Sequence, residues 1–417
     1  MIVMELVFEA GKNKHYLEID DRYSVEIIEP INVKKPNEMA EVLFGLKFPI
    51  ESQNLKDFVS DSRVLVIVND ATRPTPTETI LKAIEPELST AKELKFIVAT
   101  GSHKKPDIQE LEYIFGEFYK KLKDKIYCHN SKDKSQLIYI GDTKRATPVK
   151  INKLAVDSDK IVIINSVEPH YFAGFTGGRK SILPGISSYE TITCNHKLSL
   201  DKNAGLLRLQ GNPVHEDMMD AAYLVKKPIF NINVVCDAKR RIYRVTCGDL
   251  EKSFKKAVDH AKKLYCVPAK KKADIVIAIT SEPSDINLYQ SQKSLENSKP
   301  VLKDGGTVIL VSECRKGIGG NPTFFELLKS HKSPESLINY VKNNYLLGYH
   351  KSAKIAELAK VSKIFAVTAM NKEDIWACFM QPFDSLQEAF NKAASSYSNP
   401  HIIIIKDASI TVPILSK

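Results

Sequence analysis

The sequence lacks the features that would place it in a membrane or send it through one. Its longest apolar runs, such as Ile275 to Ile279 and Ile402 to Ile405, fall far short of the ~20 residues that a membrane-spanning helix needs. At the amino-terminus, no basic segment leads into a long apolar stretch, so nothing there resembles a secretory signal. We therefore expect a cytoplasmic protein with no membrane partner.

Cysteine is sparse and never arranged as a CxxC pair. The odd number of cysteines and their wide spacing disfavour both a disulfide framework and a thiolate zinc site. We expect most of them to be buried as small apolar side chains. The seven are Cys128, Cys194, Cys236, Cys247, Cys266, Cys314 and Cys378.

Positive charge is in excess but is not concentrated in one stripe. The chain has 60 Lys and Arg against 50 Asp and Glu, for a net charge of +10. The lysine-rich stretches 120–125 and 252–272 are amphipathic and each includes an aspartate among the lysines, as on a solvated helix face. No basic stripe is interleaved with aromatic residues and no zinc-finger spacing occurs, so we expect no nucleic-acid partner.

Short apolar runs rich in Val and Ile alternate with amphipathic segments along the 417 residues. The runs are continuous, which is typical of strands buried on both faces of a parallel sheet. Strand, loop and helix in alternation predict an α/β fold of two domains, each with a largely parallel sheet flanked by helices. The predicted strands are 64–68, 94–99, 161–164, 275–279, 307–311, 364–367 and 402–405; predicted helices include 250–264, 325–328, 336–345 and 384–395.

A domain boundary is predicted where a proline and a lysine run precede a new strand, at residues 265–273. We accordingly expect an N-terminal domain at 1–268, which contains almost every unusual motif, and a C-terminal α/β domain at 269–417.

Three predicted strands of the N-terminal part end in polar loops marked by glycine or proline, at 69–77, 99–106 and 165–185. In open α/β sheets, ligands bind outside the carboxyl ends of the strands. The three loops therefore predict one composite site.

The first two loops offer an arginine and a histidine. Pro74 and Pro76 stiffen the first loop, so Arg73 could bind a phosphate or carboxylate with two parallel hydrogen bonds. The alternative is a solvated turn with a helix cap at Thr75 or Thr77. His103 follows a strand and Gly101 and would face the crevice, but a lone loop histidine is more often a surface residue.

The third loop presents a histidine, glycines and cations together. His170 is followed by glycines and then by Lys180, which superficially resembles a nucleoside-triphosphate P-loop. The match fails, because the lysine follows Arg179 instead of glycine and Pro184 interrupts the helix that should come next.

His196 lies just beyond a segment that could cap and begin a helix. In the C-terminal part, Tyr289, Gln290 and Lys293 would share one helix face, which suits a small carboxylate or a merely exposed polar helix.

Together these motifs resemble the nickel-pincer lactate racemase family. The matching segments occur in the family's order and spacing across most of the chain. The third segment is the most specific, and the tyrosine-to-lysine helix is weak alone. The segments are DATRPTP at 70–76, TGSH at 100–103, HYFAGFTGGRKSILPG at 170–185, His196 in CNH, and Tyr289, Gln290 and Lys293.

The resemblance implies a nickel cofactor, the pyridinium-3,5-bisthiocarboxylic acid mononucleotide, attached covalently at Lys180 and supplied by cofactor-maturation enzymes. Nickel would be held by cofactor sulfurs, a ring carbon and His196, donors that suit this metal. Contacts to the cofactor would come from Asp70, Ala71, Thr72, Arg73, Gly177 and Gly178.

The resemblance also implies interconversion of D- and L-lactate through a reversible hydride transfer. His103 and His170 would be the acid/base pair, because the unperturbed histidine pKa of ~6.5 allows both roles near neutrality. Arg73, Tyr289, Gln290 and Lys293 would bind the substrate carboxylate. The active site would then lie in the interdomain cleft.

Other functions remain compatible with the residues. The closest is racemisation or epimerisation of another small 2-hydroxy acid, such as malate, an aryl or longer aliphatic hydroxy acid, or a sugar acid. A non-catalytic nucleotide- or metal-binding protein belongs to a different class. A metal-dependent hydrolase using His103, His170 and His196 is disfavoured, because no carboxylate partner is evident.

Overall fold

The structure is a computed structural model that describes residues 3–10, 13–33, 37–320 and 322–416. The chain divides into two compact units. Unit 1 combines residues 1–31 with 264–417, and unit 2 is the continuous segment 32–263. None of the helices in the described ranges is both long enough and apolar enough to cross a membrane.

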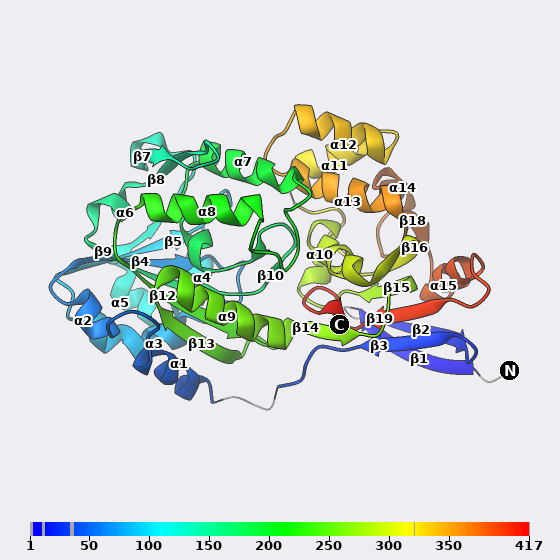
Figure 1. The fold of residues 1–417 in the computed structure, drawn as a ribbon, viewed down its shortest axis with the longest axis horizontal. Helices are drawn as coiled ribbons and strands as arrows, with labels where there is room; N and C mark the ends of the chain where they lie inside the picture. Colours follow the sequence, from blue (N-terminus) through cyan, green and yellow to red (C-terminus); the bar gives the residue numbers. More distant parts are fainter. Residues whose placement is uncertain (1–2, 11–12, 34–36, 321, 417) are drawn as a thin grey trace. The chain divides into compact units, whose positions relative to one another are not determined.

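Unit 2 is built on a six-stranded sheet in the order β13-β12-β9-β4-β5-β6 (Figure 1). All neighbouring strands are parallel except β12 and β13. Five consecutive residues of β4 are buried, because the sheet is covered on both faces. The strands are β4 (Arg63–Asn69), β5 (Glu93–Ala99), β6 (Ile126–Cys128), β9 (Lys160–Ser166), β12 (Ile229–Cys236) and β13 (Ile242–Gly248).

Helices surround this sheet and fix its loops. Val66, Phe96 and Phe230 of the sheet share one apolar core with Ile80 and Phe115 of two covering helices. The helices of unit 2 are α1 (Glu38–Lys47), α2 (Leu55–Val59), α3 (Thr77–Leu88), α4 (Ile108–Phe115), α5 (Tyr119–Leu122), α6 (Lys153–Asp157), α7 (Tyr189–Lys197), α8 (Pro213–Leu224) and α9 (Leu250–Tyr265), which ends just inside unit 1. Unit 2 also contains two short antiparallel strand pairs, β7 (Leu137–Asp142) with β8 (Pro148–Asn152) and β10 (Pro169–His170) with β11 (Gly174–Phe175).

Unit 1 contains a second six-stranded sheet, which is parallel throughout, in the order β18-β17-β16-β15-β19-β3. Its strands are β3 (Ser24–Ile28), β15 (Ala273–Ile279), β16 (Leu302–Val311), β17 (Lys363–Val367), β18 (Gln381–Phe383) and β19 (His401–Ile405). Its helices are α10 (Leu288–Ser298), α11 (Pro322–Lys329), α12 (Pro334–Asn343), α13 (Tyr349–Val361), α14 (Lys372–Ala377) and α15 (Leu386–Ala394). The strands β14 (Cys266–Ala269) and β20 (Val412–Leu415) form a separate parallel pair.

The hairpin β1 (Val3–Ala10) and β2 (Asn13–Asp20) packs on the core of unit 1. Phe8 and Leu17 of the hairpin belong to the same apolar cluster as Ile277, Ile402 and Phe390 (Figure 1 shows the hairpin beside β3). The expected domain at 1–268 therefore differs from unit 2, which lacks its first 31 residues and residues 264–268. The reason is strand pairing, since β3 adds to β19 as the edge of the C-terminal sheet and β14 pairs with β20.

The α/β class, the seven expected strands and the largely parallel sheets are confirmed. All seven cysteines are free, as expected, but Cys128 and Cys194 are only partly buried. The predicted helix at 336–345 begins and ends two residues earlier in the structure, because Ser333 caps α12 through a hydrogen bond with the Ser336 N–H.

Candidate functional site

The three predicted loops leave three adjacent strands of unit 2 at one edge of its sheet. The strands β9, β4 and β5 are neighbours and run parallel, so their carboxyl ends meet at that edge. Asn69, at the end of β4, ties the loops together, because its Oδ1 accepts hydrogen bonds from Thr75 Oγ1 at 3.0 Å and from the Ser166 N–H at 3.3 Å. The sequence thus brings the loops to one place through strand order.

Asp70 and His103 form a close pair between two of these loops. The Oδ2 atom of Asp70 lies 2.7 Å from Nδ1 of His103. Thr72 holds the other carboxylate oxygen, donating from Oγ1 at 2.6 Å and from its N–H at 3.2 Å. The Asp70 side chain is 9% exposed and that of His103 is 52% exposed, so the aspartate is fixed in the protein while the imidazole reaches solvent.

The Asp70 carboxylate is ionised at neutral pH. Burial by itself raises the pKa of Asp70, but the hydrogen bond and charge of His103, with smaller contributions from Thr72 and Arg73, outweigh burial and bring the pKa below its usual value. An ionised carboxylate can only accept, so His103 donates its Nδ1–H, and the lone pair of the neutral imidazole is then the one on Nε2. The pair therefore fixes the tautomer in which Nε2 can act as a base.

Arg73 is placed in the same turn. Its N–H donates to the Asp70 carbonyl oxygen at 3.1 Å, and its side chain is partly buried. Among the residues that the structure describes, the Arg73 guanidinium has no carboxylate partner. The guanidinium is therefore available to an anion that is not part of the chain.

A backbone hydrogen bond connects the second loop to the third. The Gly101 N–H donates to the Gly185 carbonyl oxygen at 2.9 Å, and Gly101 has a φ of +55°, a conformation that glycine adopts without strain. A Cβ atom at Gly101 would lie 3.4 Å from Cβ of Pro184. His103 is thereby held next to the segment that carries His170 and Lys180.

The Phe172 ring brings three of the predicted residues together. The His170 ring packs edge-on against Phe172 with centroids 4.5 Å apart, and the His196 ring does so at 5.2 Å. The Nζ atom of Lys180 lies 5.6 Å from the centroid of the same ring. Phe172 is 2% exposed, so it forms a fixed apolar floor for one acid/base candidate, one metal-ligand candidate and one attachment candidate.

His170 is held in the tautomer opposite to that of His103. The Ala173 N–H lies 3.3 Å from His170 Nδ1, and a main-chain N–H can only donate, so Nδ1 accepts and Nε2 carries the proton. The Tyr171 ring stacks on the imidazole, with the two centroids 5.0 Å apart. The two histidines therefore present a lone pair and an N–H, respectively, at Nε2.

Lys180 lies in a short 3₁₀ turn, Gly178–Ser181, and is partly buried. Burial lowers its pKa well below the usual value, and the positive charges of Arg73 and Arg179 add to this effect. No described carboxylate forms an ion pair with its ammonium group. The neutral amine, which is nucleophilic, is thus favoured.

Gly177 and Gly178 are required by close packing within unit 2. A Cβ atom at Gly177 would lie 2.5 Å from Val167 Cγ2, and both glycines have positive φ angles. The Gly178 N–H already donates to Asn165 Oδ1 at 3.0 Å. Their contact with a cofactor, and that of Ala71 and Thr72 in the first loop, stay predictions.

His196 lies near the end of α7 and is 9% exposed. Ser188 caps this helix, as the sequence suggested, by accepting a hydrogen bond from the Thr191 N–H. The preceding residue, Asn195, donates from Nδ2 to Asp217 Oδ2 of α8 at 2.8 Å, and Figure 1 shows the two helices side by side. Asp217 is fully buried and also accepts from Thr143 Oγ1 at 2.5 Å and from Thr147 Oγ1 at 3.0 Å.

In unit 1, Tyr289, Gln290 and Lys293 all lie in the first half of α10 and are partly buried. The phenol has a raised pKa because of burial. Lys351 of α13 holds Tyr289 in place, with Nζ 2.8 Å from the Tyr289 carbonyl oxygen and 3.7 Å from the ring centroid. The expected grouping of a phenol, an amide and an ammonium on one helix is therefore present.

A glycine-rich loop supports the start of the same helix. The N–H groups of Leu288 and Tyr289 donate to the carbonyl oxygens of Gly317 and Ile318, at 3.0 and 2.9 Å. Gly320 has a φ of +73°, and a Cβ atom there would lie 2.3 Å from Tyr289 Cδ2. The Tyr289 ring thus has almost no freedom to move toward this loop.

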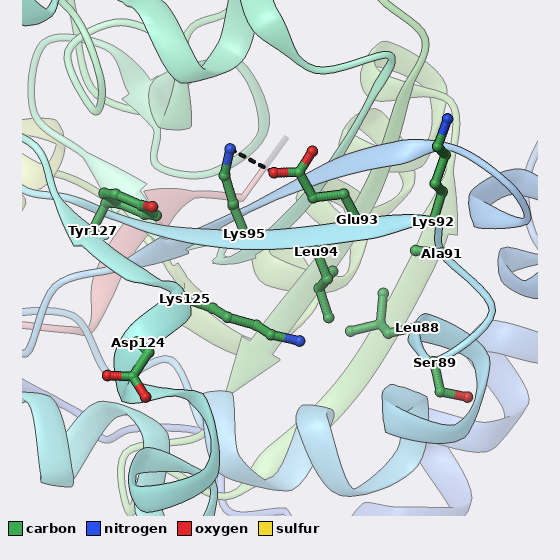
Figure 2. A pocket seen from close by; sticks show the side chains of 10 residues that line it. All are labelled: Leu88, Ser89, Ala91, Lys92, Glu93, Leu94, Lys95, Asp124, Lys125 and Tyr127. Carbon is green, nitrogen blue, oxygen red and sulfur yellow. Dashed lines mark ion pairs between the residues drawn. The ribbon is translucent and has the colours of Figure 1, made fainter.

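A shallow hollow of about 340 Å³ lies at the opposite end of the unit 2 strands (Figure 2). It is lined by the amino end of β5, including the Glu93–Lys95 ion pair at 2.6 Å, and by exposed residues such as Lys92 and Lys125. Ligands of open α/β sheets bind at the carboxyl ends of strands, so this hollow is separate from the predicted site.

The metal-ligating chemistry of the site fits an ion that is bound mainly by an organic cofactor. Within the described ranges, no group of three or more His, Cys, Asp or Glu residues could hold a metal ion. His196 offers one imidazole, and Lys180, packed on the same Phe172 ring, offers an amine for attachment. One imidazole and one amine on a common ring are compatible with a metal ion whose other ligands come from a tethered, sulfur-bearing cofactor.

The sequence predicted the polar residues that line this arrangement, but not the residues that only hold them in place. Phe172, Asn195 and Asp217 were missed, because an apolar floor and a buried helix anchor carry no motif of their own. The pairing of Asp70 with His103 was also missed, since 33 residues separate them and only strand order makes them neighbours.

Two family models match the chain, the lactate racemase N-terminal domain over residues 10–206 and the lactate racemase C-terminal domain over residues 268–413. Lactate racemase from Thermoanaerobacterium thermosaccharolyticum is 33% identical over 387 residues, covering 89% of each chain. Lactate racemase from Lactiplantibacillus plantarum is 33% identical over 359 residues, covering 82% of each chain.

Solved structures agree with these matches. The lactate racemase apoprotein from T. thermosaccharolyticum superposes with a TM-score of 0.91 at 31% identity, covering 99% of this chain and all of that one. A protein from Thermotoga maritima shares the fold, with a TM-score of 0.70 at 17% identity over 92% of this chain and all of its own.

Proposed function

Because the chain belongs to the lactate racemase family, we propose that it is an isomerase that interconverts D- and L-lactate. The main structural support for this function is the pair of histidines with opposite tautomers at one end of the unit 2 sheet. His103 presents a lone pair at Nε2 and His170 presents an N–H, because Asp70 and the Ala173 N–H fix the two Nδ1 atoms. A racemase needs one base and one acid in each direction, and the two roles exchange when the direction is reversed.

The proposed cofactor is the nickel complex of pyridinium-3,5-bisthiocarboxylic acid mononucleotide, attached at Lys180 with His196 as the protein ligand of nickel. When bound, it would supply the acceptor for the hydride that leaves C2 of lactate. The support from this chain is the weakened basicity of Lys180 and its common packing with His196 on Phe172.

The residues of the chain would handle protons and orientation. His103 would remove the hydroxyl proton of one enantiomer, and His170, in its imidazolium form, would return a proton to the oxygen when the other enantiomer forms. Arg73 would bind the carboxylate, since it has no carboxylate partner among the described residues. Tyr289, Gln290 and Lys293 of α10 would contribute further carboxylate contacts and set the small size of the substrate.

Activity and attachment can be tested on protein produced together with its cofactor-maturation enzymes. We expect either pure enantiomer of lactate to be converted to the racemate, as followed by chiral chromatography. We also expect about one nickel per chain and a covalent mass increment on the peptide that contains Lys180. A panel of malate, aryl and longer aliphatic 2-hydroxy acids should react more slowly, whereas faster turnover of any of them would replace lactate as the substrate.

A further inference from the structure

Arg179 is a fully buried arginine without a carboxylate partner in the described part of the chain. Its guanidinium donates only to main-chain oxygens, to Ala173 at 2.9 Å, Gly177 at 3.0 Å and Thr176 at 3.4 Å. Its Cζ atom lies 4.5 Å above the Phe254 ring. A buried charge without a counter-ion is costly, so its place directly before Lys180 calls for an explanation.

The three carbonyl oxygens that Arg179 binds belong to the loop that leads into Lys180. They span the segment between Phe172, on which Lys180 packs, and the turn Gly178–Ser181 that carries Lys180. The rigid, planar guanidinium of Arg179 therefore links the two ends of the segment 173–177. Arg179 is thus in a position to fix where the Lys180 amine lies.

The charges around Lys180 are positive or neutral. Burial lowers the pKa of Arg179 to about 9, which leaves its guanidinium charged at neutral pH. His215 of α8 stacks on the Phe254 ring, and burial together with the Arg179 charge lowers its pKa to about 3, so it is neutral. The nearest buried carboxylate of α8, Asp217, is engaged by Thr143, Thr147 and Asn195.

We propose that Arg179 is a positioning residue that prepares Lys180 for covalent attachment, by fixing the turn that carries the amine and by opposing its protonation. Arg73, in the loop after β4, is the second cation that acts on Lys180 in the same direction. His170 and His196 share the Phe172 ring with Lys180 and add no negative charge. The inference rests on the proposed function, because it takes Lys180 as the attachment point.

The chemistry requires only a neutral amine. The Lys180 nitrogen lone pair forms a C–N bond with the carbon of a thiocarboxylic acid group, the C–O bond breaks, and one water molecule leaves to give a thioamide. No electrons are gained or lost, so no oxidant or reductant is needed. An ammonium group has no lone pair, so only the neutral fraction of Lys180 in the apoprotein can attack.

The test measures Lys180 reactivity in the apoprotein, without any cofactor. The apoprotein is labelled with trace acetic anhydride at pH values from 6 to 11, and the acetylation rate of each lysine peptide is followed by mass spectrometry. The pH midpoint of labelling reports protonation independently of how accessible the amine is. Exposed Lys202 is the internal reference, and we expect the Lys180 midpoint to lie more than about 1 pH unit below that of Lys202.

Three variants separate charge from packing. Arg179→Gln keeps a hydrogen-bond donor but removes the charge, and it should raise the Lys180 midpoint by about 1 pH unit, lowering acetylation at pH 7 about tenfold. Arg179→Lys keeps a charge and should leave the midpoint near that of the wild type. Arg208→Met removes a charge from an exposed arginine and should leave the midpoint unchanged.

A wild-type midpoint equal to that of Lys202 would overturn the inference, whether or not the variants fold. So would a folded Arg179→Gln apoprotein with an unchanged midpoint. The proposed function fails separately, if protein made with the maturation enzymes carries no mass increment on the Lys180 peptide. A reactive Lys180 without that increment would support Arg179 activation and contradict cofactor attachment.

Discussion

The Asp70 carboxylate lies 2.7 Å from Nδ1 of His103 and joins the ends of β4 and β5. Asp70 was predicted to contact the cofactor, which stays a prediction, and the structure also gives it a direct partner in the histidine proposed to move a proton. Because the carboxylate fixes Nδ1–H, the reactive lone pair of His103 is directed through Nε2. The pair thus converts an exposed loop histidine into a base of defined tautomer.

Replacing Asp70 by Asn should lower kcat for lactate about 10²- to 10⁴-fold. The amide can donate to Nδ1, which would move the imidazole proton to Nε2 and remove the base. The Lys180 peptide should keep its mass increment. Asp124→Asn, at the distant hollow of Figure 2, is the matched control and should retain wild-type activity. Equal activity of Asp70→Asn and Asp124→Asn would contradict the role of the pair.

Replacing His103 or His170 by Ala should each reduce racemisation by at least about 10²-fold, because each direction needs both a base and an acid. Nickel content and the mass increment at Lys180 should stay at wild-type values, since neither histidine is proposed to hold the cofactor. Chiral chromatography and metal analysis on the same preparations check both expectations. A variant that loses nickel along with activity would assign that histidine to cofactor binding.

Gly320→Ala should raise KM for lactate about tenfold or more, with a smaller change in kcat. Its Cβ atom would lie 2.3 Å from Tyr289 Cδ2, so the ring proposed to line the substrate site must move. Gly317→Ala is the matched control, because Gly317 also has a positive φ, +63°, but no atom lies within 4 Å of a Cβ atom there. If both variants change KM equally, backbone strain and not the Tyr289 contact is responsible.

Asp217→Ala should weaken nickel retention without touching the proposed ligand. The change leaves the hydroxyls of Thr143 and Thr147 and the Asn195 amide without their buried acceptor, at a cost of about 1–3 kcal/mol for each group that stays unsatisfied. Since Asn195 precedes His196, loosening α7 should speed nickel loss to a chelator. Asp220→Ala on the same helix, where the exposed Lys144 is the ion-pair partner at 3.6 Å, should lose nickel at the wild-type rate.

Acid should destabilise the protein through His129. Burial lowers the pKa of His129 to about 4, against 6.5 when exposed, although its hydrogen bond to the Ser187 carbonyl oxygen opposes the shift. Between these values the unfolded chain binds the proton and the folded chain does not, so stability is full above pH 6.5 and falls as the pH approaches 4. The total loss is about 3 kcal/mol.

His129→Gln removes this titration but keeps an N–H donor for Ser187. The difference in free energy of unfolding between wild type and variant, measured with urea at several pH values, should be constant above pH 6.5. It should shrink or reverse between pH 6.5 and 4. A difference that does not change over this range would show that His129 titrates alike in both states.

The sequence predicted strands well where a continuous apolar run marks the strand locally. Continuous runs such as Val64 to Val68 and Ile402 to Ile405 are buried strands, because only a covered parallel sheet accommodates them. It failed for β3, whose SVEII pattern is short and half polar, so that nothing local reveals its pairing with β19 across most of the chain.

In the candidate site, too, the sequence revealed residues with a local signal and missed those that depend on long-range contacts. Motif residues such as His170 and Lys180 could be named from the sequence, because glycines and cations surround them. Their common floor, Phe172, could not, since an aromatic residue in a loop is more often part of the core. The state of each histidine was equally hidden, as it depends on Asp70 and on one backbone N–H that only the folded chain brings within reach.

The pairing of β3 with β19 sets an order for folding during synthesis. Unit 2 is complete once residue 263 has left the ribosome, whereas β3, made first, waits for a partner at residues 401–405. At about 5–20 residues per second, that wait is roughly 20–75 s. During it, β3 has no partner strand to join, so the nascent chain carries an unpaired strand edge while unit 2 can already be folded. The segment 3–28 is therefore where we expect a chaperone to act on this protein.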